Sequence, residues 1–237
     1  ALLAAQYRFD FFVDGALSLV WTAAAVVPLF VVYDSEGRRG IPGGSFGETL
    51  LVVGCFTLLQ GVLDGAINPG LVAVVDHIRK GTLDFVLLKP VDTQFLVSTS
   101  RFELWRSFSL LSAGLIFGFA FRAIGHGPSL WGVLAALLLF GAATSLLYSL
   151  WILIISAAFV VVKIDNLTYL FSSIFDAARW PSTVFRGAVK FIFTFIIPLV
   201  VMTTFPAEAL LGRLAPSTLA LSLVGAVAFA AMARAVW

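Results

Sequence analysis

Charge is what this sequence has least of. Only 12% of its 237 residues are Asp, Glu, Lys or Arg, whereas 60% are hydrophobic and the mean hydropathy is +1.03. Soluble domains average about 25% charged residues. A water-soluble core could not hide this much apolar surface, so the composition indicates a polytopic membrane protein. The net charge of +2 is too small to indicate a nucleic-acid partner.

The chain also lacks the groups of residues on which catalysis and metal binding depend. Its single cysteine, Cys55, lies in an apolar run and cannot form an internal disulfide. His77 and His126 have no Cys, His or carboxylate neighbours at ligand spacing, so we expect no metal site. The patterns GxxxxGK[ST] and HExxH are absent, and no paired carboxylates stand in a water-facing loop. We therefore expect no enzyme activity and no cofactor bound by this chain.

Long apolar runs are what the sequence has in abundance. A membrane span needs about 20 mostly apolar residues, and in hydrocarbon such a segment satisfies its backbone hydrogen bonds as a helix. Six segments qualify, which predicts an all-α fold with six transmembrane helices in one transmembrane domain. They are Phe11–Tyr33, Thr49–Val75, Ser107–Ala123, Leu130–Val162, Ala188–Phe205 and Ser217–Val236.

The distribution of Lys and Arg predicts the orientation, because cytoplasmic loops carry an excess of these residues. If the amino terminus is cytoplasmic, eleven basic residues lie inside and four lie outside. The inside set is Arg8, Arg79, Lys80, Lys89, Arg101, Arg106, Lys163, Arg179, Arg186, Lys190 and Arg234, and the outside set is Arg38, Arg39, Arg122 and Arg213. We therefore expect both termini in the cytoplasm. The segment from Pro206 to Pro216 is then an outer connection that could form a short surface helix.

One cytoplasmic connection, between the second and third spans, is unusually dense in charge. It reads DHIRKGTLDFVLLKPVD from Asp76 to Asp92, and we call residues 76–95 the coupling segment. Thr82 can cap a short helix in which Leu83, Val86 and Leu87 share one face. Such a helix could dock in a groove on a cytosolic partner. The alternative is an ordinary interfacial loop whose charges are simply solvated.

A second charged stretch follows the fourth span. Between Lys163 and Gly187, apolar residues recur at helical spacing with charged residues between them. This pattern predicts an amphipathic helix at the cytoplasmic interface over about 164–180, which ends near Pro181.

Polar residues also occur inside the second span. Asp64 lies there near Gln60 and Asn68. A carboxylate at membrane depth costs roughly 2.5–3.5 kcal/mol on insertion scales, so it should face protein or water. Together with Pro198, which can kink the fifth span, these residues form a candidate substrate path. The alternative for Asp64 is a hydrogen bond to a neighbouring helix.

Two blocks of the sequence carry a resemblance to a known family. The first is IRKGTLDFVLLKPVD, followed by Gln94-Phe95 and Arg101, and the second runs from Ala178-Arg179-Trp180-Pro181 through Phe191–Pro198 to Phe205-Pro206. Both resemble permease subunits of ABC-2 type exporters, and most closely the small six-span branch whose permeases act in pairs beside a separate ATPase subunit. The similarity covers nearly the whole chain. Such permeases begin with a basic elbow helix, and because only Arg8 precedes the first span we expect that element to be truncated.

The resemblance implies a partner and a role for the coupling segment. In the family this loop carries the coupling helix, which docks on the nucleotide-binding subunit. Carried over, docking falls on Arg79, Lys80, Gly81, Thr82, Leu83, Asp84, Leu87, Lys89 and Pro90. The resemblance further implies two ATPase subunits, which bind the ATP and magnesium, and a second permease subunit, homologous or identical. We expect the complex to lie in a bacterial inner (plasma) membrane. The apolar interior and sparse fixed charge suggest an amphiphilic or hydrophobic cargo, such as a lipid, a glycolipid or a drug-like compound.

Two other functions compete with this one. An ion-coupled carrier could use Asp64, but it should show inverted repeats or broken helices in both halves, and no second-half segment matches. A membrane-embedded enzyme would need clustered catalytic residues at one interface, which the sequence lacks.

Overall fold

The chain folds as a bundle of helices. The structure, a computed structural model, describes residues 13, 17, 20, 23–24, 26–31, 33, 44–103, 108–157 and 171–237. Every regular element in these ranges is helical, which confirms the predicted all-α class. The elements are α2 (Phe46–Val62), η1 (Leu63–Ile67), α3 (Asn68–Arg79), α4 (Leu83–Leu87), α5 (Thr93–Ser98), α6 (Phe108–Ile124), α7 (Leu130–Ser156), η4 (Asp176–Arg179), η5 (Ser182–Val184), α9 (Gly187–Phe191), η6 (Ile192–Ile196), α10 (Leu199–Leu210) and α11 (Pro216–Val236).

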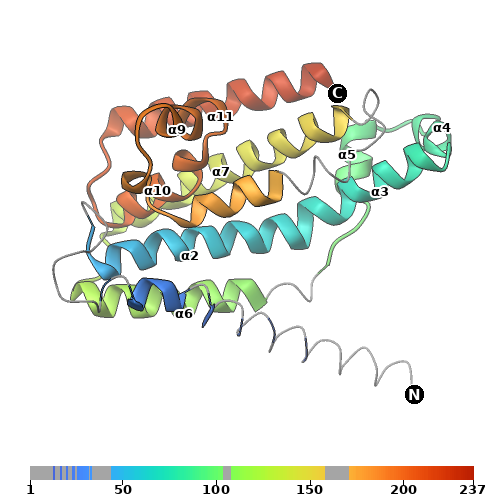
Figure 1. Cartoon of the computed structure of the whole chain (residues 1–237). Coiled ribbons are helices and arrows are strands. Elements are labelled where there is room, and N and C mark those ends of the chain that lie inside the picture. The colour runs from blue at the N-terminus through green and yellow to red at the C-terminus, as the bar shows by residue number, and fades with distance from the viewer. Residues whose placement is uncertain are drawn as a thin grey trace.

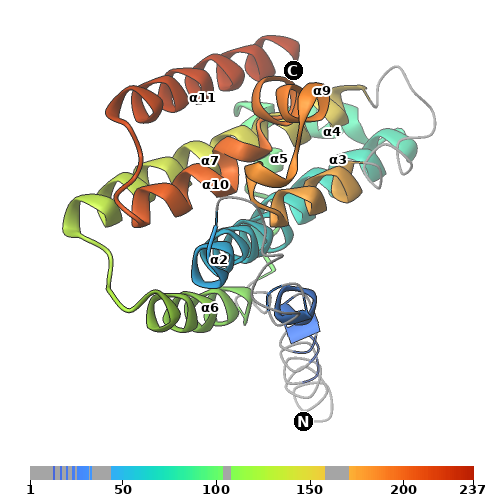
Figure 2. The ribbon, with the colours of Figure 1, turned by 60° about the vertical axis from the view of Figure 1, so that its left-hand side comes forward.

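The long helices lie side by side. Helix α7 lies between α11 on one side and α2 on the other, and α6 covers the far side of α2 (Figure 1 and Figure 2). The short helices α4 and α5 and the carboxyl terminus gather at one end of the bundle in both views. We call this the coupling end.

Helices α2 and α3 form one continuous rod with a π-helical turn, η1, between them. Ser45 caps the start of α2, where its hydroxyl accepts from the Glu48 amide and the Glu48 carboxylate accepts from the Ser45 amide. In η1 the Asn68 amide donates to the Leu63 carbonyl, five residues earlier. Pro69 follows directly, and a proline ring nitrogen cannot donate to the carbonyl four residues before it.

The loop after α5 supplies the hydrogen bond that Pro69 cannot donate. The carbonyl four residues before Pro69 belongs to Gly65, and it accepts from the backbone amide of Glu103 at 2.8 Å. The chain after α5 is thereby fixed to the rod at the π-helical turn. A bulge of this kind is tolerated because an outside donor satisfies the backbone.

Helix α6 approaches α2 closely through three glycines spaced seven residues apart. A Cβ atom on Gly47, Gly54 or Gly61 would lie 2.6–2.8 Å from Ile124, Phe117 or Ser109 respectively. Small residues at this spacing let two helices pack closely within a membrane. Gly114 and Gly118, which form a GxxxG pattern in α6, face open space instead.

Helix α7 supplies the centre of the core. Leu147, Trp151 and Ile155 are fully buried in a cluster that also contains Leu59 and Leu71 of the rod. Helices α10 and α11 pack on the remaining sides of α7. Helix α11 is the most exposed of these, with only Ser222, Ala226 and Ala233 buried.

The predicted interfacial helix is described only in part. Its first part, up to residue 170, lies outside the described residues. In its second part Phe175 and Ala178 are buried against α2 and α10, whereas Ser173 and Asp176 are exposed. Thr203 of α10 donates its hydroxyl to the Ala178 carbonyl at 2.8 Å, and Thr204 accepts from the Ser182 amide. Apolar spacing alone cannot distinguish a face that meets lipid from one that meets protein. The helix does end before Pro181, as predicted.

The fifth span is broken rather than kinked. Gly187–Ile196 and Leu199–Leu210 meet at an angle of 85°. Ile197 leaves the helical conformation, and Pro198 stands at the start of α10 without an amide proton to continue the ladder. Helix α10 then runs through Pro206 to Leu210, so the predicted outer connection begins five residues later than Pro206.

Fewer than six helices of spanning length are found in the described ranges. Within the described ranges three helices are long and apolar enough to cross a membrane, namely Phe46–Arg79, Leu130–Ser156 and Pro216–Val236, and the bent pair makes a fourth if it is one span. Helix α6 has 17 residues, and nearly half of the first predicted span lies outside the described residues. Six spans therefore stay a prediction.

Candidate docking site

The coupling end begins where α3 stops. Lys80 ends the helix, and Gly81 follows with φ of +63°. The Gly81 amide donates to the Ile78 carbonyl at 3.2 Å, and the Thr82 amide donates to the His77 carbonyl at 2.9 Å. This pair of bonds is the Schellman motif, which satisfies the last carbonyls of a helix and turns the chain sharply. It fixes the angle at which α4 leaves the rod.

Thr82 stands at the predicted capping position but does not cap α4 with its side chain. Its hydroxyl lies 2.8 Å from Nδ1 of His77, one turn back in α3. The predicted capping hydrogen bond is therefore wrong, because the Schellman turn brings the His77 side chain within reach of the Thr82 hydroxyl. The hydroxyl secures the turn instead of the helix that follows.

Helix α4 points its apolar residues in two directions, which differs from the single predicted face. Leu83 and Val86 are half-buried and pack against the core. Phe85, Leu87 and Leu88 are exposed, at 70%, 53% and 79%. We call these three residues the apolar tip. Of the apolar residues predicted for docking, Leu87 therefore faces outward, whereas Leu83 anchors the helix.

Charged residues flank the apolar tip in the sequence. Arg79, Lys80, Asp84 and Lys89 are exposed, and Pro90 is exposed in the turn that follows. Exposed large apolar side chains beside charged ones suit docking on a partner. Seven of the nine predicted docking residues are exposed there, and only Thr82 and Leu83 are half-buried.

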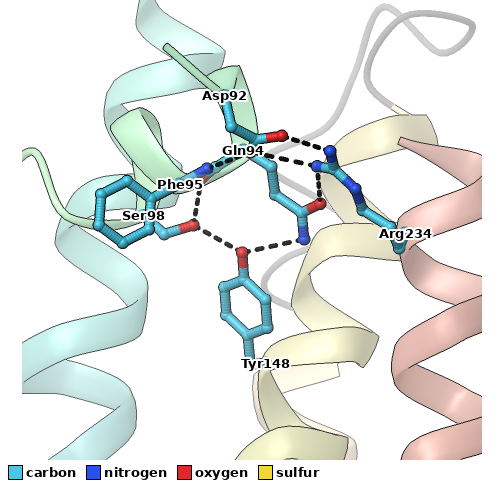
Figure 3. A network of polar contacts seen from close by, with 6 residues as sticks. All are labelled: Asp92, Gln94, Phe95, Ser98, Tyr148 and Arg234. Carbon is cyan, nitrogen blue, oxygen red and sulfur yellow. Dashed lines mark hydrogen bonds and ion pairs between the residues drawn. The ribbon is translucent and has the colours of Figure 1, made fainter.

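Helix α5 holds the other side of the coupling segment in place. Asp92 caps it, accepting from the Phe95 amide at 2.9 Å. The same carboxylate pairs with the guanidinium of Arg234 in the last turn of α11 (Figure 3). Hydrogen bonding to Arg234, and then to the Phe95 amide, lowers the pKa of Asp92 below its ordinary value of 3.8. Asp92 is therefore ionised at neutral pH.

A buried amide extends this network into the bundle. Gln94 is only 9% exposed; its Oε1 accepts from Arg234 at 2.7 Å, and its Nε2 donates to the Tyr148 hydroxyl at 3.1 Å. Ser98 lies 2.6 Å from the same hydroxyl and donates to the Gln94 carbonyl at 2.7 Å. Helices α5, α7 and α11 thus meet in one set of polar contacts (Figure 3).

Backbone packing joins α5 to α3 as well. A Cβ atom on Gly70 would lie 2.7 Å from the Val97 carbonyl oxygen and 3.1 Å from that of Ser98. Only glycine permits this approach, because a backbone oxygen cannot swing aside as a side chain can. The coupling segment therefore rests on a rigid support at both its ends.

Of the four residues predicted to line a substrate path, three belong to the rod and the fourth to the fifth predicted span. Gln60, Asp64 and Asn68 lie on successive turns of the rod, all half-buried, and Asn68 donates to the Asp64 carboxylate at 3.2 Å. Pro198 is buried in the break between η6 and α10. A cavity of about 670 Å³ lies elsewhere, between α2, α6 and residues 23–30, and none of the four lines it. Among the residues that the structure describes, no group of three or more His, Cys, Asp or Glu side chains could hold a metal.

Neither the outermost residues of the tip nor the polar network at Arg234 was predicted from the sequence. Phe85 and Leu88 were overlooked because the direction of a five-residue helix depends on the turn before it. Gln94, Tyr148 and Arg234 come from three distant segments, so no local pattern joins them. The one available signal was Arg234 itself, a cation in the last turn of an apolar helix.

The fold and the comparisons together define the class of protein. An all-helical chain with three or four apolar helices of spanning length is an integral membrane protein. A family model described as "ABC-2 family transporter protein" matches residues 19–237, so the chain belongs to the ABC-2 transporter family. Comparisons with curated proteins and with solved structures find no match. Family membership makes the chain a transport component rather than an enzyme by itself, and implies association with an ATP-binding cassette ATPase subunit.

Proposed function

We propose that this chain is the permease subunit of an ATP-binding cassette exporter, and that a separate ATPase subunit drives it through the apolar tip of α4. The observation that carries the proposal is the exposure of Phe85 and Leu88, at 70% and 79%, on a helix whose other face is anchored in the core. Large apolar side chains held in this way are typical anchors for a groove on a partner.

The docking surface that we propose differs from the one expected from the resemblance. Phe85, Leu87 and Leu88 enter the groove, and the charged residues Lys80 and Lys89 flank them in the sequence. Gly81, Thr82 and Leu83 set the direction of the helix, and Arg79, Asp84 and Pro90 flank the surface.

The proposed cycle needs four chains. ATP clamps two ATPase subunits together, and their motion displaces the coupling segments of two permease subunits, homologous or identical. The permeases then rock between inward-facing and outward-facing states. ATP selects one state because it stabilises the closed ATPase pair and not the open one.

Orientation and cargo follow as further parts of the proposal. The coupling end lies in the cytoplasm, since docking on a cytosolic ATPase requires it and the Lys and Arg count favours it. The cavity between residues 23–30, α2 and α6 is lined by Val27, Phe46, Ile116 and other apolar side chains, and Arg122 is the one charged lining residue in the described part of the chain. This composition suits an amphiphilic or hydrophobic cargo with an anionic group.

The test is a capture experiment from native membranes. The permease is purified with whatever binds it, and we expect a captured chain that carries a GxxxxGK[ST] phosphate loop and hydrolyses MgATP. Replacing Phe85 and Leu88 together by Asp should weaken this association at least about 100-fold, because each anchor contributes about 2 kcal/mol or more. Thr99→Asp adds one negative charge, against two in the double variant, at an exposed site of the coupling end away from the tip, and should leave the capture unchanged.

If the Asp variants at Phe85 and Leu88 retain the ATPase subunit as well as the unchanged protein does, the docking surface is elsewhere and the proposal is wrong.

A further inference from the structure

The network at the coupling end joins elements that no short loop connects. Arg234 lies 142 residues from Asp92 and 140 from Gln94, and Tyr148 lies 50 residues from Ser98. Docking alone does not require these contacts, because the apolar tip is carried by α4 and the turn at Gly81.

We propose that Arg234 is a positioning residue for coupling: it ties α5 to α11 and α7, so that displacement of the coupling segment moves these helices together with α3. This inference rests on the proposed function, and it adds the route by which motion at the tip reaches the helices beyond the rod.

The geometry of Arg234 suits a tie between two groups. One guanidinium nitrogen donates both to Gln94 Oε1 at 2.7 Å and to Asp92 Oδ1 at 3.2 Å, and the other donates to Asp92 Oδ2. A planar guanidinium can hold a carboxylate and an amide oxygen in this way, whereas a lysine ammonium is a point charge without the fixed fork. The last turn of α11 also favours a cation, because the carbonyl end of a helix carries negative partial charge.

The available protons decide which group donates and which accepts in the inner part of the network, which Gln94, Tyr148 and Ser98 form. Arg234 can only donate, so it fixes the amide oxygen of Gln94 toward itself and the amide nitrogen toward Tyr148. Ser98 uses its one proton for the Gln94 carbonyl, so Tyr148 must donate to Ser98. Each of these hydroxyls therefore both donates and accepts. A fully satisfied network of this kind fixes one arrangement of α5 against α7.

Helix α11 needs such a contact if it is to follow the coupling segment. Along its length it packs on α7, and only Ser222, Ala226 and Ala233 are buried. Without Arg234, displacement of the tip would pass to the rod through the turn at Gly81 and the close approach at Gly70. With Arg234 in place, α11 and α7 receive it as well.

The experiment measures a distance within the whole complex. Cysteines replace the exposed Thr99 at the end of α5 and Met232 in the last turns of α11, in a chain whose single cysteine, Cys55, is changed to Ala. Spin labels on the two cysteines report their separation by pulsed electron resonance, with the captured ATPase subunit, with and without ATP and vanadate. For the unchanged network we expect one narrow distance distribution that ATP does not alter.

Three variants and one control separate positioning from simple stability. Arg234→Ala should at least double the width of the distribution and make it sensitive to ATP, while the ATPase subunit is still captured. Tyr148→Phe removes the inner part of the network without touching a charge and should widen the distribution as well. Asp92→Arg combined with Arg234→Asp should restore part of the narrow distribution. Arg213→Ala removes the ion pair with Glu48 at the opposite end and should change nothing.

The outcomes for the inference and for the proposed function are distinct. If Arg234→Ala and Tyr148→Phe both leave the distribution as narrow as before, the inference is overturned even when the ATPase subunit binds. If the unchanged permease captures no ATPase subunit, the proposed function fails, and the widths measured on the permease alone still decide whether Arg234 ties α5 to α11.

Discussion

At each end of the bundle a helix stops at a glycine in the left-handed conformation. Gly81 has φ of +63° at the coupling end, and Gly212 has φ of +70° at the opposite end. Both turns have the two backbone bonds of the Schellman motif. The segments that follow are different: residues 211–215 carry no exposed large apolar side chain, whereas α4 exposes Phe85 and Leu88.

Each end also has an ion pair between distant segments. Arg213 lies 2.8 Å from the Glu48 carboxylate at the opposite end, and Arg234 pairs with Asp92 at the coupling end. The first pair fixes the capping residue of α2 to the connection after α10. The second belongs to a network that reaches a third helix. The coupling end thus joins three helices through one network, whereas the ion pair at the opposite end joins two segments.

The largest expected effect comes from filling the close approach at Gly70. Valine there would press against the backbone oxygens of Val97 and Ser98, which overpacks the site at a cost of about 1–3 kcal/mol or more. We expect Gly70→Val to lower the melting temperature and to abolish capture of the ATPase subunit, because α5 must move. Capture and thermal unfolding are measured on the same preparation.

The matched variant for Gly70→Val is Gly47→Val, where the new side chain meets Ile124 of α6 at the opposite end. It should lower the melting temperature to a similar extent but leave capture intact. Equal loss of capture in both variants would contradict the distinction between the two ends.

The next effect concerns the two left-handed glycines. Alanine in this conformation costs about 1–2 kcal/mol at either position. Gly81→Ala and Gly212→Ala should therefore reduce stability by similar amounts in thermal unfolding. Only Gly81→Ala should weaken binding of the ATPase subunit in a titration, because it alone changes the direction of α4. A weaker complex from Gly212→Ala would argue against this.

A smaller effect on the melting temperature is expected when the pH is lowered. The pKa of Asp92 is lowered in the folded chain, so its pairing contributes stability fully above its ordinary value of 3.8 and loses it as the pH falls through the lower folded value. Asp92→Asn keeps a good helix cap but removes the charge. The difference in melting temperature between the two proteins should be constant from pH 8 to pH 5 and shrink as the pH falls below 3.8. A difference that changes around neutral pH would implicate another group.

The smallest effect should come from Asp64. Its carboxylate accepts from Asn68 one turn later, as expected of a structural residue within a π-helical turn. Asp64→Asn should therefore leave capture and the ATPase activity of the complex within about twofold of the unchanged protein. An ion-coupled carrier would instead lose transport, so a large loss would revive that alternative.

Much of the fold was predictable because a long apolar run identifies a membrane helix in the sequence. The predicted segments at 49–75, 130–162 and 217–236 match helices of spanning length in the described residues. The break at Pro198 was foreseen as a kink, but its angle depends on how α9 and α10 pack. Burial of Phe175 and Ala178 could not be foreseen, since an apolar face can meet lipid or protein equally well.

The position of the candidate site was predictable, whereas its chemistry was only partly so. The charged run around Gly81 marked the coupling segment, and α4 begins at Leu83 as expected. The Schellman turn then rotates the short helix, so that Leu83 faces inward and Phe85 outward. The network at Arg234 depends on tertiary contacts over more than 100 residues, which no local pattern contains.

The most direct test of the central claim is protection of the tip from a water-soluble reagent. A cysteine in place of Leu88, in a chain whose Cys55 is changed to Ala, is alkylated with and without the ATPase subunit, and a cysteine in place of Arg213 serves as the probe of the opposite end. We predict at least tenfold slower alkylation at position 88 when the subunit is bound, and no change at position 213. An unchanged rate at position 88, or protection at position 213 instead, would contradict the account.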